Sequence, residues 1–346
     1  MLKWFEKSSG GTDDVVISSR VRLARNIEKY NFPSKISEED AGKIIDEVKE
    51  AVLNVHDDNN YFHAINMKEL SSLEKIAMVE RHVISPNFVR TSIPTGLILS
   101  QDESISIMVN EEDHLRIQSI TNGLDLEKAL ENAYIIDDLL EEKITYAYDE
   151  NIGYLTSCPT NVGTGLRASY MIHVPALETT GKLQFILDAI GKFGITVRGI
   201  YGEGSKARGS VFQISNQITL GHSEHEIIDN LTSLTKQIVE QERALRNKLL
   251  NEKRLQFEDA VFRSYGTLAH ARIITSKEAM TLLSDIKLGY ELGILKSDLK
   301  NPINIYGLMT CIQPANLQKK INKELKIDER DIERATYIRN NLPKII

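Results

Sequence analysis

The chain has 346 residues, 41% hydrophobic residues and a formal net charge of −7, which allows a sizeable core and two domains and gives no support to a general nucleic-acid-binding surface. Its two cysteines, Cys158 and Cys311, are too few and too far apart for a disulfide framework or a zinc site. With no apolar signal stretch and no apolar run near the roughly 20 residues that span a bilayer, we expect a cytoplasmic protein with reduced thiols and no membrane partner.

The first part of the chain alternates short strands with amphipathic helices. Ser37 followed by Glu38 and Glu39 is typical of a capped helix start, and Ile44 and Val48 continue that helix at the expected spacing. Further helices are predicted over 126–140 and from 183 to about 191, and strands over 96–99, 104–109, 144–148, 153–157, 195–200 and 211–214. Because neighbouring strands are joined by short turns, we expect antiparallel pairing.

The character of the sequence changes after Gly221. Ser223 and Glu226 form a capping-box pattern, and residues 227 to about 262 contain almost no helix breakers. The remaining residues offer helix starts at Ser276 and Asp328 and little strand pattern. We therefore predict a catalytic domain over residues 1–240 and an all-helical domain over residues 241–346, with a boundary that a helix can cross.

The run from Ser18 to Asn26 carries three arginines. In an extended segment Arg20 and Arg22 project from one face, because side chains alternate with a period of two. Planar guanidinium groups that are always charged suit the phosphate oxygens of a phosphoryl-transfer site. On these residues alone, the favoured interpretation is a solvated edge strand whose charges prevent further pairing, and the role of Arg25 stays open.

The ten residues from Cys158 to Arg167 combine a thiol, two glycines and an arginine. This run closely resembles the signature of the phosphagen kinases, the ATP:guanido phosphotransferase family, which transfer a phosphoryl group from ATP to a guanidinium. The runs 18–26, 110–116 and 197–205 match further motifs in the family's order. The resemblance implies an α+β catalytic domain of the glutamine-synthetase-like type, with a largely antiparallel sheet flanked by helices. It also implies ATP and Mg²⁺ as cofactors, while no sequence motif indicates a metal site of the protein's own.

The resemblance also assigns the phosphate-binding side of the site. Arg20, Arg22, Arg116 and Arg167 match phosphate-binding arginines of the family. The other residues expected at the nucleotide are Ser19, Asn161, Gly163 and Arg198. Two alternatives stay open: Arg116 paired with an acid on a surface helix, and the glycine-rich run 197–205 as a mobile loop rather than a lid.

The acceptor side needs a group that orients a guanidinium and takes its proton, because the guanidinium pKa is about 12.5–13.8. A carboxylate can do both. Glu112 matches the family's acceptor-holding acid, whereas its neighbour Glu111 faces elsewhere in any regular structure. Cys158 is the second catalytic candidate, as a thiol that positions the guanidinium, and Arg167 completes the set. The alternative for Cys158 is a small buried apolar residue.

The chain departs from the small-molecule kinases at two levels. Tyr201 and Lys206 stand where those enzymes carry a phosphate-binding arginine and a second acceptor carboxylate, although Arg198, Glu203 and Arg208 lie nearby in the sequence. Because the run at Ser18 lies near the start of the sequence, we expect no helical domain before it, and about a hundred residues follow the catalytic region instead. This layout resembles the bacterial protein-arginine kinases of the McsB type, so an open acceptor site is expected.

That resemblance implies several partners and a regulatory site. It implies protein substrates with exposed arginines, marking for a Clp-type unfoldase, a heat-shock repressor among the substrates, a zinc-binding activator protein and a homodimer formed through the helical region. Arg330, Asp331 and Arg334 resemble an allosteric phosphoarginine-binding motif of that branch; the alternative is an ordinary charged helix. Two other functions stay open: a kinase of free arginine or another small guanidine, and an adaptor that binds phosphoarginine with little catalysis.

Overall fold

The computed structural model describes residues 2–7, 14–53, 61–191, 194–199, 208–297 and 304–346. None of the helices in these segments is both long and apolar enough to cross a bilayer. The predicted residues Tyr201, Glu203 and Lys206 lie outside the described residues.

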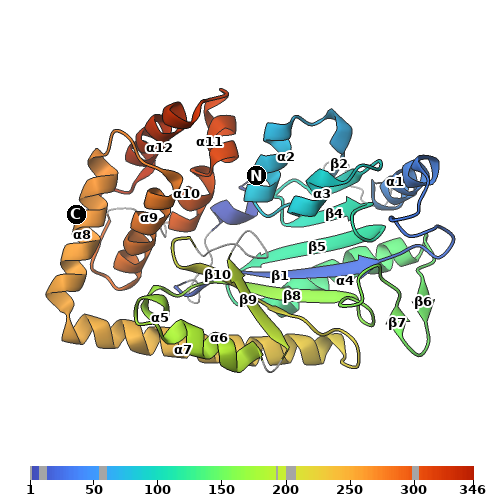
Figure 1. Ribbon diagram of the computed structural model, residues 1–346, viewed down its shortest axis with the longest axis horizontal. Helices are drawn as coiled ribbons and strands as arrows, with labels where there is room; N and C mark the ends of the chain where they lie inside the picture. Colours follow the sequence, from blue (N-terminus) through green and yellow to red (C-terminus); the bar gives the residue numbers. More distant parts are fainter. Residues whose placement is uncertain (1, 8–13, 54–60, 192–193, 200–207, 298–303) are drawn as a thin grey trace.

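The described residues form one eight-stranded sheet in the order β2-β3-β4-β5-β1-β8-β10-β9, with every neighbouring pair antiparallel (Figure 1). Its strands are β1 Val16–Arg25, β2 Phe62–Asn66, β3 Gly96–Ser100, β4 Ile105–Val109, β5 Leu115–Asn122, β8 Leu166–His173, β9 Ile195–Gly199 and β10 Val211–Asn216. The predicted α+β fold with a largely antiparallel sheet is confirmed. Strand β1 runs through the middle of the sheet, between β5 and β8.

The strands predicted over 144–148 and 153–157 are much shorter in the structure. Only β6 Tyr148–Asp149 and β7 Gly153–Tyr154 pair with each other. The residues between Ile144 and Ala147 instead follow the end of β1, where Ala147 N–H donates to Asn26 O and Tyr146 forms an isolated bridge with Ile27. The local hairpin that the sequence pattern indicates is therefore present but short, and the residues before it pair with the end of β1 instead.

One face of the sheet is covered by α1 Glu38–Leu53, α4 Leu126–Glu141 and α7 Glu224–Glu252. The apolar residues predicted for the second of these helices, from Leu126 to Leu140 at helical spacing, are all buried against the sheet. Asp125 caps this helix by accepting a hydrogen bond from Lys128 N–H. Shorter helices complete this region: η1 Trp4–Glu6, η2 Met67–Glu69, α2 Ser72–Glu80, α3 Pro86–Arg90, α5 Pro175–Thr179 and α6 Lys182–Gly191.

The remaining described residues are helical, as predicted, with the helices gathered beside the sheet (Figure 1). They form α8 Arg254–His270, α9 Ser276–Glu291, α10 Ile305–Cys311, α11 Pro314–Ile321 and α12 Ile327–Asn341. Helix α7 starts at the predicted capping box of Ser223 and Glu226 and continues without a break to Glu252. It therefore crosses the predicted boundary at residue 240, and Lys253 separates it from α8.

The helical region is joined to the sheet region through α2. The Glu80 carboxylate accepts hydrogen bonds from Ala315 N–H and Asn316 N–H at the start of α11, and Arg81 donates to the Asn316 side chain at 2.9 Å. Trp4 packs beside Tyr306 of α10, and its indole N–H donates to Arg81 O. These contacts bring the helical domain close to the face of the sheet that α4 leaves uncovered.

A buried arginine also holds α7 to both regions. Arg246, which is only 2% exposed, pairs with Glu242 at 2.7 Å and with Glu291 of α9 at 2.9 Å. It donates to the backbone carbonyls of Asp14 and His173 as well. Its guanidinium therefore satisfies four acceptors from separate parts of the chain.

We predict that Arg246→Ala lowers the free energy of unfolding by about 3–5 kcal/mol, because the buried carboxylate of Glu242 loses its cationic partner and keeps only the N–H groups of Ala176 and Leu177. Lys248→Ala on the same helix is the matched control, since Lys248 and its partner Glu252 are exposed, and it should change stability little. Urea unfolding followed by circular dichroism measures both variants. Equal midpoints for the two would contradict this role of Arg246.

Candidate active site

The arginines of β1 share one face of the sheet. Arg20 and Arg22 are two residues apart in a regular strand, and the pairing places Arg22 directly between Gln118 of β5 and Arg167 of β8. Arg116 lies opposite Ala24, two residues further along the same face. The interpretation of this run as an edge strand is therefore wrong, because β1 is paired on both sides.

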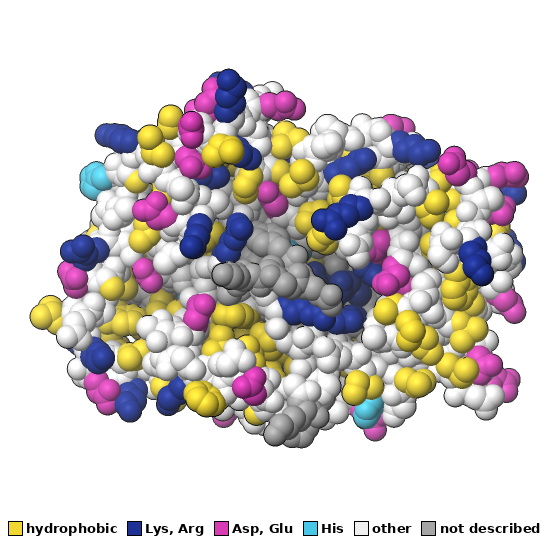
Figure 2. All heavy atoms as spheres, viewed as in Figure 1, with side chains coloured by type: hydrophobic (Ala, Val, Ile, Leu, Met, Phe, Trp, Pro, Cys, Tyr) yellow, Lys and Arg dark blue, Asp and Glu magenta, His cyan; other side chains and the backbone are white. Residues whose placement is uncertain are grey.

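A cavity of about 640 Å³ opens over this face of the sheet. It brings together eight of the residues predicted from the sequence: Arg20, Arg22, Glu112, Arg116, Cys158, Asn161, Arg167 and Arg198. Six arginines line it, and Glu112 is the only acidic side chain among the described lining residues. Figure 2 shows basic side chains gathered in a hollow near the centre of the molecule. The cavity is therefore strongly electropositive and suited to a polyanion.

The arginines on the floor of the cavity are buried and repel one another. Burial, together with the positive charges of Arg116 and Arg167, lowers the pKa of Arg20 to about 10. Burial likewise lowers the pKa of Arg22, followed by the charges of the neighbouring arginines. Arg22 Nε is buried and has no hydrogen-bond partner among the described residues. Like charges directly opposite each other destabilise a sheet, so this arrangement costs folding energy that an anionic ligand would offset.

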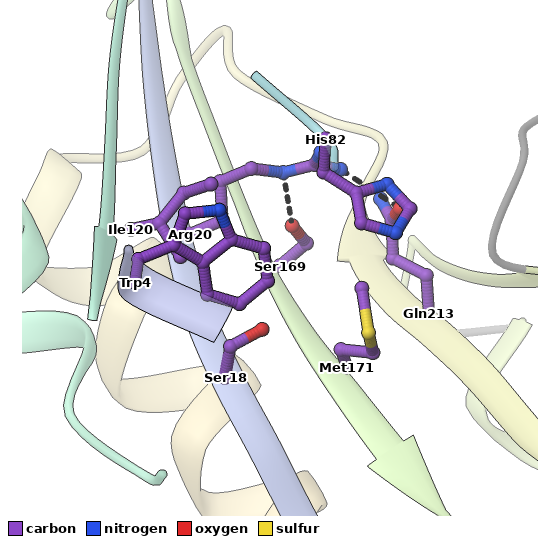
Figure 3. Close-up of a pocket in the computed structure, with 8 residues that line it drawn as sticks. All are labelled: Trp4, Ser18, Arg20, His82, Ile120, Ser169, Met171 and Gln213. Atoms are coloured by element: carbon purple, nitrogen blue, oxygen red, sulfur yellow. Dashed lines mark hydrogen bonds between the residues drawn. The ribbon is translucent and has the colours of Figure 1, made fainter. Parts of the chain in front are cut away.

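Arg20 is held by two strands that lie on the same side of β1. It donates to Gln213 Oε1 at 2.8 Å and to Ser169 Oγ at 3.4 Å, both from strands beyond β1 (Figure 3). A small cavity of about 10 Å³, the size of one water molecule, lies between it and the side chains of Trp4 and His82. Burial lowers the pKa of His82 to about 3, helped by the charge of Arg20, so this imidazole stays neutral beside the guanidinium.

The two acids considered for the acceptor side, Glu111 and Glu112, lie in the turn between β4 and β5. Arg116 Nη1 is 2.5 Å from Glu111, and Arg116 Nη2 is 3.2 Å from Glu112. The interpretation of the second pair as a surface helix is wrong, because Arg116 belongs to a strand. Glu111 is buried and also accepts from Ser85, whereas the Glu112 side chain is 43% exposed and lines the cavity. Of the two acids, only Glu112 is accessible to an acceptor.

Cys158 is half-buried and lines the same cavity. Its Sγ lies 3.0 Å from Thr160 Oγ1, and its backbone carbonyl accepts from Thr156 Oγ1 and from Asn161 N–H. The alternative of a small buried apolar residue does not fit Cys158 but does fit Cys311, which is in the core of the helical domain.

The structure does not bring Ser19 or Gly163 to this cavity. Ser19 points to the opposite face of β1, where its hydroxyl donates to Gly123 O and accepts from Asp125 N–H at the start of α4. Gly163 lines a separate cavity of about 570 Å³ behind the loop. Its φ of +104° and the close approach of Thr219 O explain the glycine, because a Cβ would lie 2.9 Å from that oxygen. We therefore assign both residues to the support of the site.

Arg25, whose role the sequence leaves open, is also structural. It is buried, pairs with Asp137 at 2.7 Å, donates to Thr164 O and stacks on the ring of Tyr154 at 3.5 Å. It anchors the far end of the loop from Cys158 to Arg167 rather than contacting the cavity.

Several lining residues were not predicted, among them His82, Ser85, Arg90, Gln118, Gln213 and Ser215. The period of two along the strands could have found Gln118, which is two residues beyond Arg116 and so shares its face. The rest come from strands and loops far away in the sequence, whose register no local pattern gives.

The tail motif lies in α12, away from the cavity. Arg334 is 2% exposed, donates to the carbonyls of Ile274 and Ile312, and pairs with Asp331. These contacts use its guanidinium to hold the helical domain together. Arg330 and Asp331 remain partly exposed and are the residues of the motif that a ligand could reach.

The described residues contain no group of three or more His, Cys, Asp or Glu side chains that could hold a metal ion. Among the described residues, the charged groups that line the cavity are guanidinium groups and the carboxylate of Glu112, which fit phosphate oxygens rather than a bare cation. Any Mg²⁺ would be held chiefly by the phosphates of the nucleotide.

Two family models and several relatives match the chain. Residues 43–245 match the ATP:guanido phosphotransferase C-terminal catalytic domain, and residues 254–345 match the protein-arginine kinase McsB C-terminal domain. A protein-arginine kinase from Caldanaerobacter subterraneus is 51% identical over 96% of this chain and 98% of its own length. One from Halalkalibacterium halodurans is 49% identical over 98% of this chain and 94% of its own length.

Solved structures show the same fold at lower identity. Lombricine kinase has a TM-score of 0.59 at 24% identity, covering 70% of this chain and 71% of its own. The duplicated taurocyamine kinase from Schistosoma mansoni has a TM-score of 0.60 at 23% identity, covering 71% of this chain and 36% of its own. With its cavity of arginines, its matching domains and relatives about half identical over nearly the whole length, the chain belongs to the ATP:guanido phosphotransferase family and carries the McsB-type C-terminal domain.

Proposed function

We propose that this protein is an ATP-dependent kinase that phosphorylates arginine side chains in other proteins. The observation that carries the proposal is the cavity itself, in which a floor of arginines meets the accessible carboxylate of Glu112 and the thiol of Cys158. The choice of a protein acceptor is supported by the relatives named protein-arginine kinase and by the matching C-terminal domain.

In this proposal Arg20, Arg22, Arg116 and Arg167 bind the phosphates of ATP on the floor of the cavity. Phosphoryl transfer spreads negative charge over the equatorial oxygens, and fixed guanidinium donors stabilise that charge without reorganising. Asn161 and Arg198 line the same cavity and supply further contacts. Mg²⁺ bound to the nucleotide would neutralise part of the phosphate charge.

On the acceptor side, Glu112 takes a bidentate grip on the substrate guanidinium and accepts its proton as the N–P bond forms and the bond from the γ-phosphorus to the β-γ bridging oxygen breaks. Cys158, which lines the same cavity, orients the guanidinium and forms no covalent bond. Holding the nucleophile in line with the phosphoryl group accounts for much of the rate, because the enzyme has little covalent chemistry to perform.

The McsB-type domain extends the proposal to a biological setting. We place the enzyme in the bacterial cytoplasm, where it would mark proteins for a Clp-type unfoldase, act on a heat-shock repressor, respond to a zinc-binding activator and work as a homodimer. Arg330 and Asp331, which are partly exposed on α12, would bind phosphoarginine away from the active site.

The first prediction concerns the acceptor. Incubation with Mg-ATP, free arginine and an unfolded arginine-rich protein should give acid-labile phosphate on the protein, and the same protein with lysine in place of arginine should stay unlabelled. Label on free arginine would instead indicate a kinase of small guanidines. Label on neither, together with tight phosphoarginine binding, would indicate an adaptor and contradict the proposal.

A second prediction separates the two acceptor-side groups. Glu112→Gln should lower kcat by about 10³-fold or more, because no other described acid lines the cavity to take the proton. Cys158→Ser should keep measurable activity, roughly 10- to 100-fold below the parent, because it removes only an orienting group. Steady-state kinetics at saturating ATP measures both. A folded serine variant with no activity would show that the thiol does more than orient the acceptor.

A further inference from the structure

A buried cluster of Asn26, Asp113 and His114 joins the two loops that carry the acceptor-side groups. All three side chains are at most 2% exposed. Asp113 Oδ1 accepts from Ser157 N–H at 2.6 Å and from Asn26 Nδ2 at 2.7 Å. Glu112 is the residue before Asp113, and Cys158 is the residue after Ser157, so one carboxylate oxygen links their backbones.

The end of β1 completes the cluster. Asn26 Oδ1 accepts from His114 N–H at 2.9 Å, and Asn26 Nδ2 also donates to Leu155 O at 3.0 Å. His114 Nδ1 accepts from Ile27 N–H, so its proton lies on Nε2, which donates to Asn31 O. Each side chain therefore fixes backbone groups of a different segment.

These contacts lie directly behind the reaction site rather than in it. None of the three residues lines the cavity, whereas Glu112, Cys158 and Ala24 do. The β4–β5 turn and the loop before Cys158 have no regular sheet pairing with each other among the described residues, so side chains must set their spacing. Hydrogen bonds to a buried carboxylate are strong and leave little freedom in the donors.

We propose that Asp113 is a positioning residue that fixes the distance between the Glu112 carboxylate and the Cys158 thiol, with Asn26 as its partner. The inference rests on the proposed roles of Glu112 and Cys158 in holding an arginine. Its consequence is selective: loss of Asp113 impairs acceptor binding and transfer while the arginine floor, which belongs to the central strands, keeps its affinity for ATP.

The second oxygen of Asp113 suggests the conservative variant. Oδ2 is buried without a hydrogen-bond partner among the described residues, so both contacts depend on Oδ1 alone. Asp113→Asn keeps an oxygen at that position, whereas Asp113→Ala removes it. Asn26→Ala breaks the same cluster from its other side and serves if Asp113→Ala does not fold.

The test measures acceptor kinetics, ATP affinity and thiol reactivity in these variants. In Asp113→Ala, kcat/KM for the protein acceptor should fall about 10- to 100-fold, since a misplacement near 1 Å costs about 10²-fold. The Kd for ATP should stay within about twofold, and Asp113→Asn should recover most of the loss. In a Cys158→Ser background, Asp113→Ala should lower kcat/KM by a smaller factor, because both changes impair the same positioning of the acceptor.

Alkylation of Cys158, followed by mass spectrometry with iodoacetamide as the probe, gives a readout that does not depend on catalysis. Its rate should rise by about threefold or more in Asp113→Ala, since the half-buried thiol gains access. Ile117→Ala, a core change on the neighbouring strand, is the control for lost stability and should leave this rate unchanged.

Equal losses for ATP and acceptor, or unchanged alkylation in a folded Asp113→Ala or Asn26→Ala variant, would overturn the positioning role. If the parent enzyme labelled no protein, the proposed function would fail instead, and the alkylation rate would still decide whether the cluster holds the Cys158 loop.

Discussion

The repulsion among guanidinium groups on one face of the central strands is the constraint around which this molecule is built. Arg22 lies directly opposite Arg167, with Arg20 and Arg116 close by, and burial deprives these charges of water. A fold tolerates this only where the surrounding structure holds the strands firmly. Here β1 is paired along its length on both sides, and its other face is packed on α4. The stability of the paired strands thus offsets the repulsion among the arginines of the cavity.

The two ends of the cavity are supported by different means. At the phosphate end, Arg20 is held by Gln213 and Ser169, and Trp4 and His82 close its back against the helical domain. At the acceptor end, the two loops meet through buried polar side chains. In the proposed function, phosphate binding would therefore depend on sheet pairing, whereas acceptor binding would depend on a few side-chain hydrogen bonds that substitution can remove separately.

Much of the fold and part of the site could be predicted from local pattern. The period of two placed Arg20 and Arg22 together, helical periodicity found α4, and the capping box of Ser223 and Glu226 gave the start of α7. The same alternation places Ser19 on the opposite face of the strand from Arg20. The family resemblance nevertheless put Ser19 at the nucleotide, because a motif match identifies a residue and does not say in which direction its side chain points. The Arg116 pair was misassigned to a helix in the competing interpretation because a spacing of four residues also fits a tight turn. Gln213, Asp113 and Arg246 act through partners far away in the sequence, which no local signal shows.

The most direct test of the central claim is titration of the protein with inorganic tripolyphosphate, an anion that has the charge of ATP but no base or sugar. The account predicts binding that competes with ATP, weakens as salt rises, and is lost in large part in Arg22→Met while that variant stays folded. Tripolyphosphate that fails to compete with ATP, or binds Arg22→Met as tightly as the parent, would show that the arginine face is not the phosphate site.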